Sequence, residues 1–259
     1  MTGTLDGLRA VVTGGGSGIG AALAHRLAAA GARVAVNDVD GDRTATVAQA
    51  VGGIALPGDA ASDDGARSLV EAADAALGGI DLFCANAGVG TGGGPQAPDA
   101  DWDHAWQVNV MAHVHAARHL LPGWLERGRG HLLATVSAAG LLTMPGAAPY
   151  AVTKHAALGF AEWMAMTYGG RGITVQALCP QGVRTPMLDA TGEVGRLVLE
   201  PEAISAEEVA EIAVSELGSG RFLVLPHPQV ARYSARKAAD PDAWLAAMRE
   251  VQARLDAGG

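Results

Sequence analysis

Short apolar runs of strand length alternate with longer segments of helical periodicity along most of the chain. The apolar runs are rich in Val, Leu and Ala and mostly lack polar alternation, which is typical of strands buried on both faces of a sheet. Seven strands are predicted, at residues 8–13, 33–37, 54–57, 81–84, 132–136, 173–178 and 222–225. Six helices are predicted between and after them, at residues 18–30, 41–51, 62–77, 100–127, 150–168 and 206–218.

This alternation predicts one α/β domain over residues 1–259. Repeated strand–helix units favour a parallel sheet with right-handed crossovers and a ligand at the carboxyl ends of its strands. We therefore expect a Rossmann-like, doubly wound, seven-stranded parallel sheet with helices on both faces. No break in composition marks a linker.

Composition narrows the class of partner. Hydrophobic residues make up 49% of the chain but aromatic residues only 4%, so Ala, Val and Leu must form the core. The net charge of −9 argues against nucleic acid or an anionic membrane as a partner. Cys84 and Cys179 each end a predicted strand and are expected to be free thiols. Because residues 1–6 carry neither a basic nor an apolar stretch, we expect a cytoplasmic protein.

The turn after the first strand is dense in glycine. Glycine lets the backbone turn tightly and approach a pyrophosphate, whose charge is favoured by the start of the following helix. A merely tight strand–helix turn is the structural alternative. The glycines are Gly14, Gly15, Gly16, Gly18 and Gly20.

Tyr150 and Lys154 are four residues apart on a predicted helix and therefore share one face. A free phenol has a pKa near ~10, and a neighbouring ammonium favours the phenolate. Ser137 precedes this pair in the chain. Together with the glycine loop, these residues indicate a catalyst that moves a proton at a hydroxyl beside a nucleotide cofactor. Alternatively, Tyr150 is an amphipathic side chain at a helix start and Lys154 its solvated neighbour.

Several motifs in one order, over about residues 5–226, resemble the short-chain dehydrogenase/reductases. They are the glycine loop from Thr13 to Gly20, Asn86–Ala87–Gly88, Asn109, Ser137, Tyr150 and Lys154. The resemblance implies that Tyr150 exchanges a proton with the substrate while hydride moves to or from nicotinamide. It also implies that Lys154 holds the phenol toward phenolate, that Ser137 orients the carbonyl oxygen and that Asn109 anchors a proton-carrying water.

The resemblance further implies a cofactor site that spans the whole sheet edge. Its residues are Gly14, Gly16, Ser17, Gly18, Ile19, Gly20, Asp38, Asp59, Ala60, Asn86, Ala87, Gly88, Tyr150, Lys154, Pro180, Val183 and Thr185. Asp59 and Ala60 are expected against the adenine, although Asp59 could equally be a helix-start acid. Gln181 departs from the pattern, because the family usually has glycine there.

Asp38 favours NAD over NADP. A carboxylate after the second strand can accept both ribose hydroxyls of NAD and repels a 2′-phosphate, although it could also be an ordinary capping acid. NADP-preferring members usually carry a basic residue at one of two places, which here hold Ser17 and Val39.

We therefore expect an NAD-dependent oxidoreductase that interconverts a secondary alcohol and a ketone. An NADP-dependent carbonyl reductase and a non-catalytic cofactor-sensing protein are the alternatives. No metal site is predicted. His115 and His119 have metal-compatible spacing, but no acid lies between them as in a zinc-protease helix, so packing or surface roles are favoured for them and for His113.

Two late segments are expected to shape the substrate site. Residues 187–203 contain leucines and valines, no aromatic residue, and the glycines Gly192 and Gly195, which predicts a mobile lid over an apolar pocket. Residues 228–257 form a predicted helical extension that buries an apolar stripe against its own domain or a second subunit. The expected substrate is a largely apolar alcohol or ketone, and the family resemblance implies a homodimer or homotetramer. The stripe comprises Trp244, Leu245, Met248, Val251 and Leu255.

Overall fold

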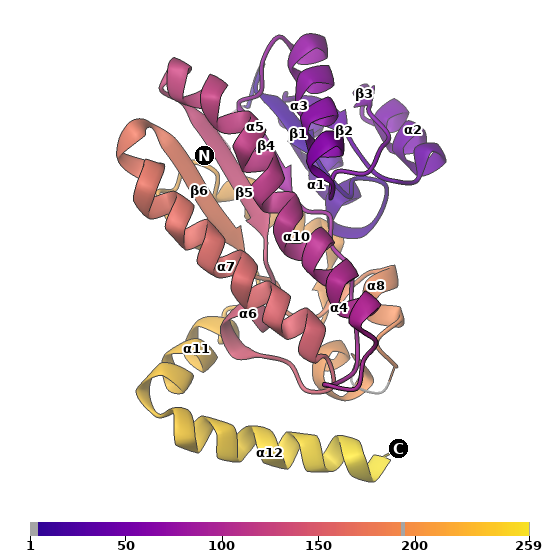
Figure 1. Cartoon of the computed structure of the whole chain (residues 1–259), viewed down its shortest axis with the longest axis vertical. Coiled ribbons are helices and arrows are strands. Elements are labelled where there is room, and N and C mark those ends of the chain that lie inside the picture. The colour runs from indigo at the N-terminus through magenta and orange to yellow at the C-terminus, as the bar shows by residue number, and fades with distance from the viewer. Residues whose placement is uncertain (1–4, 193–194, 259) are drawn as a thin grey trace.

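A seven-stranded sheet forms the centre of the computed structural model, which describes residues 5–192 and 195–258 (Figure 1). Its strands follow the order β3-β2-β1-β4-β5-β6-β9 and every neighbouring pair is parallel. The predicted Rossmann-like fold class is therefore confirmed. The strands are β1 (Arg9–Val12), β2 (Arg33–Val36), β3 (Ile54–Ala55), β4 (Leu82–Ala85), β5 (Gly130–Thr135), β6 (Ile173–Leu178) and β9 (Leu223–Val224).

Helices cover both faces of this sheet. One face carries α1 (Gly18–Ala29), α2 (Gly41–Ala50) and α10 (Ala206–Ser215); the other carries α3 (Asp63–Leu77), α5 (Ala112–Arg127) and α7 (Ala148–Tyr168). Side chains alternate along each strand, so Val11 joins the core under α3, α5 and α7 while Val12 joins the core under α1 and α10. Within the described residues, no helix is both long and apolar enough to cross a membrane.

The helix predicted at 100–127 is interrupted. It consists of α4 (Asp99–Trp106), a π-helical turn η1 (Gln107–Met111) and α5. The π turn contains Asn109, which is fully buried. Since π turns are rare and occur often at functional sites, this interruption indicates a functional role for Asn109.

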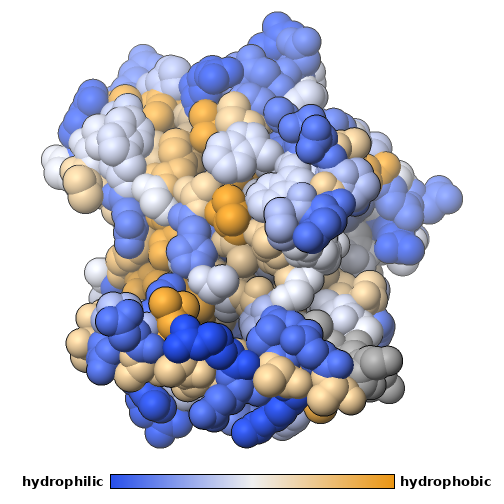
Figure 2. All heavy atoms as spheres, turned by 60° about the horizontal axis from the view of Figure 1, so that its bottom comes forward, coloured by the Kyte–Doolittle hydropathy of each residue, from blue (hydrophilic) through white to orange (hydrophobic). Residues whose placement is uncertain are grey.

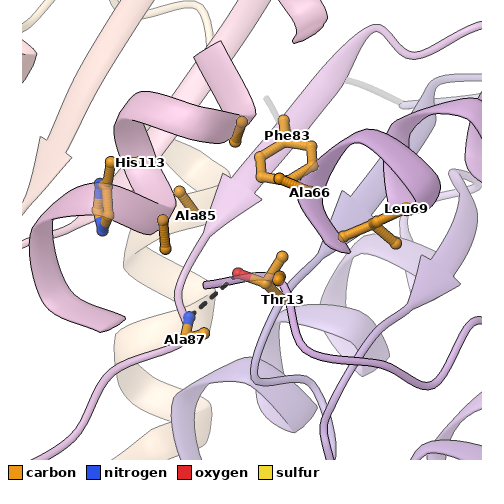
Figure 3. Close-up of a pocket in the computed structure, with 10 residues that line it drawn as sticks. Thr13, Ala66, Leu69, Phe83, Ala85, Ala87 and His113 are labelled. Atoms are coloured by element: carbon orange, nitrogen blue, oxygen red, sulfur yellow. Dashed lines mark hydrogen bonds between the residues drawn. The ribbon is translucent and has the colours of Figure 1, made fainter. Parts of the chain in front are cut away.

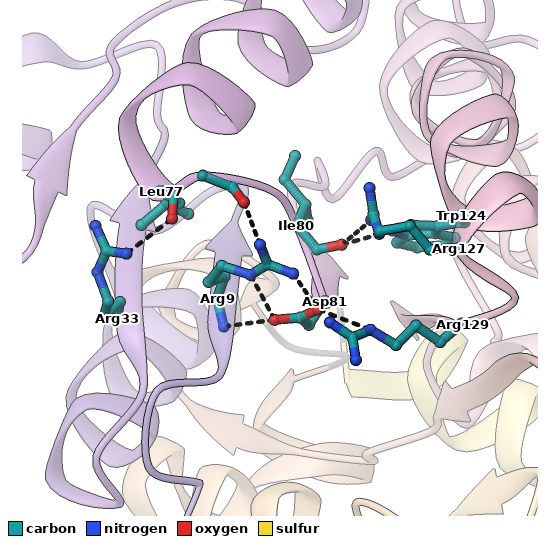
Figure 4. Close-up of polar contacts among 9 residues, drawn as sticks. Arg9, Arg33, Leu77, Ile80, Asp81, Trp124, Arg127 and Arg129 are labelled. Carbon is teal, nitrogen blue, oxygen red and sulfur yellow. Dashed lines mark hydrogen bonds and ion pairs between the residues drawn. The ribbon is translucent and has the colours of Figure 1, made fainter.

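A network of polar contacts fixes the amino-terminal edge of the sheet (Figure 4). Asp81 binds the Arg9 guanidinium at 2.6 and 2.7 Å, and Arg129 lies 3.7 Å from the same carboxylate. The Trp124 indole donates to the Ile80 carbonyl at 2.7 Å, and Arg127 donates to the same oxygen at 2.9 Å. The hydrogen bond from Arg9 lowers the pKa of the Asp81 carboxyl, so Asp81 is an ionised carboxylate paired with arginine at this edge.

The segment between β6 and α10 has more structure than the sequence predicts. A two-stranded parallel ladder joins β7 (Val183–Arg184) to β8 (Ile204–Ser205). Between these strands lie α8 (Pro186–Asp189), the π-helical turn η3 (Gly195–Leu199) and the 3₁₀ turn η4 (Glu200–Glu202). The predicted lid at 187–203 falls within this segment, and residues 193–194 of it lie outside the described residues.

Beyond β9 the chain continues as α11 (Gln229–Ala239) and α12 (Pro241–Gly258). Lys237 at the end of α11 donates to the Leu141 carbonyl of the short helix α6 (Ala139–Leu142) at 2.7 Å. Trp244 is buried and its ring centroid lies 6.2 Å from that of Tyr233. Along the rest of the predicted stripe, Leu245 is exposed and the other three residues are half-buried.

Figure 1 shows α12 at the end of the molecule remote from β2 and β3. When that end is turned toward the viewer, hydrophobic residues gather across the middle of the face, above a largely hydrophilic rim (Figure 2).

Candidate active site

The glycine loop after β1 packs directly against the end of β4. Gly14 has a φ of +61°, and a Cβ at this position would lie 2.8 Å from the Ala87 Cα. A Cβ on Gly20 would overlap the Gly14 carbonyl oxygen. The Asn86 side chain donates to the Thr13 carbonyl at 3.1 Å, which holds the two strand ends together. Only glycine therefore fits at both ends of this loop.

The loop leads into the amino terminus of α1, which is open to a ligand. Ser17 is the N-cap residue, and its side chain caps no backbone N–H within the described residues. Gly18 has a φ of +51°, and a Cβ there would lie 3.1 Å from the Thr185 Cγ2 atom. Gly16 and Ile19 are half-buried beside it. A cradle of backbone N–H groups at a helix start fits a pyrophosphate.

Asp38 lies beside this cradle at the end of β2. Its carboxylate accepts hydrogen bonds from the backbone N–H groups of Gly16 at 3.0 Å and Asp40 at 3.1 Å. Val39, the next residue, is 75% exposed. The acid is thus oriented by backbone groups at the rim of the loop.

Asp59 and Ala60 lie just before α3, as both an adenine contact and a helix-start acid would require. Asp59 is exposed and accepts from the Ala61 N–H at 2.9 Å, while Ser62 caps the helix. Ala60 is buried. The backbone turn at Asp59 is compatible with either an adenine contact or a helix-start acid.

Ser137, Tyr150 and Lys154 converge at the carboxyl end of β5. Ser137 follows this strand with a φ of +125°, which is strained for a residue with a side chain, and its hydroxyl accepts from the Ala139 N–H at 3.1 Å. Tyr150 lies in the first turn of α7, and the Lys154 ammonium is 5.5 Å from its ring centroid. The ammonium is buried and donates to the Thr135 carbonyl at 3.1 Å.

Burial sets the ionisation of this group. It raises the pKa of the Tyr150 phenol, against which the hydrogen bond with Ser137 acts. It also lowers the pKa of Lys154 to about 8. Burial therefore acts against the phenolate that a neighbouring ammonium is expected to favour, because it disfavours the charged form of each residue.

Asn109 connects the π turn to the neighbouring loop and to α7. Its side-chain oxygen accepts from the Val89 N–H at 2.9 Å, and its amide donates to the Val89 carbonyl at 3.0 Å and to the Thr153 hydroxyl at 3.1 Å. A Cβ on Gly88 would lie 3.2 Å from the Asn109 oxygen and 3.4 Å from the Lys154 ammonium. Asn109 thereby fixes the position of α7 relative to the loop after β4.

The loop at 180–185 closes the site on its remaining side. The Pro180 carbonyl accepts from the Ala138 N–H at 2.8 Å, directly beside Ser137. Val183 is buried, and the Thr185 hydroxyl donates to the Val183 carbonyl at 3.1 Å. The loop therefore runs from the residue next to Ser137 to Gly18 of the glycine loop.

His113 was not predicted as a site residue. It is 1% exposed, and neither ring nitrogen has a hydrogen-bond partner among the described residues. Burial and the charge of Lys154 lower its pKa to about 3, so the ring is neutral. It lines a cavity of about 10 Å³ together with residues that include Thr13, Phe83 and Ala87 (Figure 3). Its place one helical turn after Asn109 is the only signal that the sequence gives.

The remaining candidates for metal or redox chemistry have other partners. His115 lies 2.9 Å from the Ala61 carbonyl, and His119 lies 3.1 Å from Asp63. In the part of the chain that the structure describes, no three His, Cys, Asp or Glu residues gather to hold a metal ion. Cys84 and Cys179 are free and buried, and burial raises the pKa of each thiol to about 12.

Known proteins share both the sequence and the fold. The short chain dehydrogenase family model matches residues 9–194. The 1-deoxy-11-beta-hydroxypentalenate dehydrogenase of Streptomyces exfoliatus is 39% identical, over 91% of this chain and 88% of that protein. The 2,5-dichloro-2,5-cyclohexadiene-1,4-diol dehydrogenase of Sphingobium indicum is 38% identical, over 71% and 76%. A short chain dehydrogenase/reductase from Burkholderia phymatum, solved in complex with NAD, superposes with a TM-score of 0.85 and 28% identity, over 93% of this chain and 96% of that one.

Proposed function

Because the chain belongs to the short-chain dehydrogenase/reductase family, we propose that it is an oxidoreductase that uses NAD to interconvert a secondary alcohol and a ketone. The observation that carries this proposal is the convergence of Ser137, Tyr150 and Lys154 at the sheet edge that also carries the glycine loop. A nicotinamide cofactor in this cradle supplies the hydride acceptor or donor.

In the oxidation direction, Tyr150 accepts the hydroxyl proton of the alcohol as the carbonyl forms. Ser137 donates a hydrogen bond to the substrate oxygen and holds it next to the phenol. Lys154 is buried beside the phenol and carries a positive charge below its pKa of about 8. That charge favours the phenolate at the moment of proton transfer, and the burial excludes competing water.

Residues around the ribose support a preference for NAD. Asp38 is held at the rim of the cradle by two backbone N–H groups, so its carboxylate would face the ribose hydroxyls and repel a 2′-phosphate. Ser17 and Val39 offer no positive charge to such a phosphate. A 3-ketoacyl-(acyl-carrier-protein) reductase from Brucella melitensis, 26% identical with a TM-score of 0.79 over 85% of this chain and 96% of that one, was solved with NADH.

We propose a largely apolar alcohol or ketone as the substrate. The names of two relatives refer to a hydroxypentalenate and to a cyclohexadienediol. In this chain Leu188 is buried in α8, and the Met187 side chain contacts the position of Gly90 across the site. The segment at 187–203 would act as a lid that presents these apolar residues to the substrate.

A homodimer or homotetramer is the proposed assembly. Large apolar side chains are exposed on α4 and α7, including Trp106 at 42%, Trp163 at 50% and Met166 at 81%. Exposed apolar surface of this kind is typical of a subunit contact. Light scattering should give a multiple of the 26.1 kDa chain mass, and a monomer at micromolar concentration would contradict this part of the proposal.

The function is tested by turnover with a panel of cyclic and acyclic secondary alcohols and ketones, followed by the absorbance of reduced nicotinamide. At least one alcohol should be oxidised with NAD at a kcat/KM at least about tenfold above that with NADP. A preference for NADP would favour the carbonyl reductase alternative. Tight NADH binding without turnover of any compound would favour the cofactor-sensing alternative.

A further inference from the structure

A buried histidine from the carboxyl end of the chain binds the backbone of the loop at 180–185. His227 is 2% exposed and follows β9. Its Nδ1 atom accepts a hydrogen bond from the Gln181 N–H at 3.1 Å, and its Nε2 atom lies 3.1 Å from the Gly182 carbonyl oxygen. The Gln181 N–H can only donate and the Gly182 carbonyl can only accept, so this pair of bonds assigns a neutral ring with its proton on Nε2.

Side chains extend this contact to the segment before β8. The Gln229 amide donates to the Glu202 carboxylate at 2.6 Å and to the Gln181 side-chain oxygen at 3.4 Å. Gln181, Gly182, Glu202, His227 and Gln229 therefore form one cluster, which we call the His227 network. Its members come from the loop at 180–185, from η4 and from the start of the C-terminal extension.

The backbone around Gly182 is closely packed and leaves no room for a side chain. A Cβ on this residue would overlap the Leu199 carbonyl oxygen, and the Gly182 carbonyl also accepts from the Ile204 N–H at 3.2 Å. On either side of this point, Pro180 binds the residue next to Ser137 and Thr185 lies against Gly18. A shift at residues 181–182 would consequently move both the substrate end and the pyrophosphate end of the site.

We propose that His227 is a positioning residue, which in its neutral form holds the loop at 180–185 in the shape that binds the nicotinamide half of the cofactor. Protonation would place an N–H opposite the Gln181 N–H and break that bond, so cofactor affinity falls in acid. Gln229 keeps η4 docked on the same loop. This inference rests on the proposed use of a nicotinamide cofactor.

The surroundings of the ring favour the neutral form at neutral pH. The charged groups that face it are Glu202 from η4 and Glu208 from α10, and Arg184 of β7 pairs with Glu208 at 3.6 Å. The two carboxylates favour the protonated ring, but burial outweighs them and lowers the pKa of His227 below its ordinary value. The switch therefore operates below about pH 6.5.

The test compares NADH affinity, measured by nucleotide fluorescence, in the wild type, His227→Phe and His227→Asn. In the wild type the Kd should rise as the pH falls from 7.5 to 5. His227→Phe should bind NADH about tenfold more weakly at pH 7.5 and lose the pH dependence, because no nitrogen accepts from Gln181. In His227→Asn the amide oxygen can replace Nδ1, so affinity should recover to within about threefold of the wild type while staying independent of pH.

His131→Phe is the matched control. This histidine lies in β5 at the opposite edge of the sheet, bonded to Gln176 at 2.9 Å, so its loss should change stability but not NADH affinity. The proposal is overturned if His227→Phe binds NADH as tightly as the wild type, or if both Phe variants lose the same affinity. It is also overturned if the wild-type Kd does not change between pH 5 and 7.5, a measurement that needs no variant to fold.

Amide hydrogen exchange separates this proposal from the proposed function. A wild type that binds neither NADH nor NADPH would refute the proposed function alone. Even then, exchange at the Gln181 and Gly182 amides of the cofactor-free protein should be faster in His227→Phe than in the wild type, and unchanged in His131→Phe. Equal exchange in all three proteins would refute the His227 network as a support of this loop.

Discussion

The ionisable groups at the two edges of the sheet differ in what shifts their pKa values. At the amino-terminal edge, Asp81 is bound by Arg9 and approached by Arg129, and pairing lowers the pKa of the carboxyl (Figure 4). At the carboxyl edge, Lys154 is buried against the Thr135 carbonyl and Tyr150 lies beside it. Burial raises the pKa of Tyr150 and lowers that of Lys154, so it favours the neutral form of each residue. Removing one member of such an ion pair leaves an uncompensated charge and costs stability, whereas ionisable groups whose pKa is shifted by burial are typical of functional sites.

The contrast assigns different tasks to the two edges. The Asp81 network can be removed only at the expense of stability, since it touches no residue of the proposed site. The Tyr150 hydroxyl should be removable with little loss of stability, since its proposed role is proton transfer. Variants at each edge should therefore change different measured quantities.

The largest effect is expected from Tyr150→Phe, which removes only the proton-transfer group of the carboxyl edge. The value of kcat should fall about 10²-fold or more, while the Kd for NAD and the free energy of unfolding stay close to wild type. Tyr168→Phe, at the other end of the same helix, is the control and should leave kcat unchanged. Steady-state kinetics and urea unfolding measure both quantities. Near-normal turnover by Tyr150→Phe would exclude Tyr150 as the acid–base group.

The converse variant is Asp81→Asn, which leaves the Arg9 guanidinium partly buried without a full counter-charge. The free energy of unfolding should fall by about 2 kcal/mol, with kcat/KM unchanged. Asp64→Asn breaks the exposed pair with Arg67 and should cost less than about 0.5 kcal/mol. If Asp81→Asn lowered kcat/KM at constant stability, the division between the two edges would be wrong.

The sequence predicts the parts of this molecule that depend on local pattern. Apolar runs identify all seven strands of the central sheet. The glycine loop is also recognisable, because glycine is required where Gly20 meets the Gly14 carbonyl and where Gly14 meets the Ala87 backbone after β4. The π turn at Asn109 escapes detection because one extra residue hardly changes a helical periodicity. The ladder between β7 and β8 is two residues long, which is below the length of a recognisable strand.

Long-range burial explains the remaining failures. His227 binds residues 181 and 182 across more than 40 positions of sequence, and no local pattern announces that contact. The direction of the Tyr150 pKa shift depends on the burial of the phenol, which the spacing to Lys154 does not reveal. Residue types give the proposed chemistry of the carboxyl edge, whereas packing determines its ionisation.

A third prediction tests the cost of buried groups near the carboxyl edge. His113 has a pKa of about 3 in the folded protein and 6.5 in its ordinary state, so the unfolded chain binds more protons between these values. Stability is therefore present above pH 6.5 and is lost as the pH falls, by about 2 kcal/mol between pH 7 and pH 5. His131, with a pKa of about 4, adds a loss in the same direction.

His113→Leu should therefore remove roughly half of the combined loss of stability in acid that His113 and His131 cause, measured by urea unfolding at several pH values. The exposed His104, changed to Leu in the same way, is the control and should keep the wild-type slope. Identical slopes in all three proteins would show that His113 is protonated in the folded state or has a partner that the cavity accommodates.

The smallest effect is expected at Asp38, which combines the features of both edges. It lies at the carboxyl edge, but its charge is satisfied by the N–H groups of Gly16 and Asp40, so the carboxylate is held in place without a counter-charge. A fixed, unneutralised acid should discriminate against a 2′-phosphate. Wild-type kcat/KM with NAD should exceed that with NADP by at least about tenfold, or roughly 1.4 kcal/mol, and Asp38→Ser should bring the two close to parity. Asp42→Ser, an exposed acid in the first turn of α2, should leave the ratio unchanged. A wild type that uses NADP as well as NAD would mean that the orientation of Asp38 by the backbone serves the loop alone, and that cofactor choice is made elsewhere.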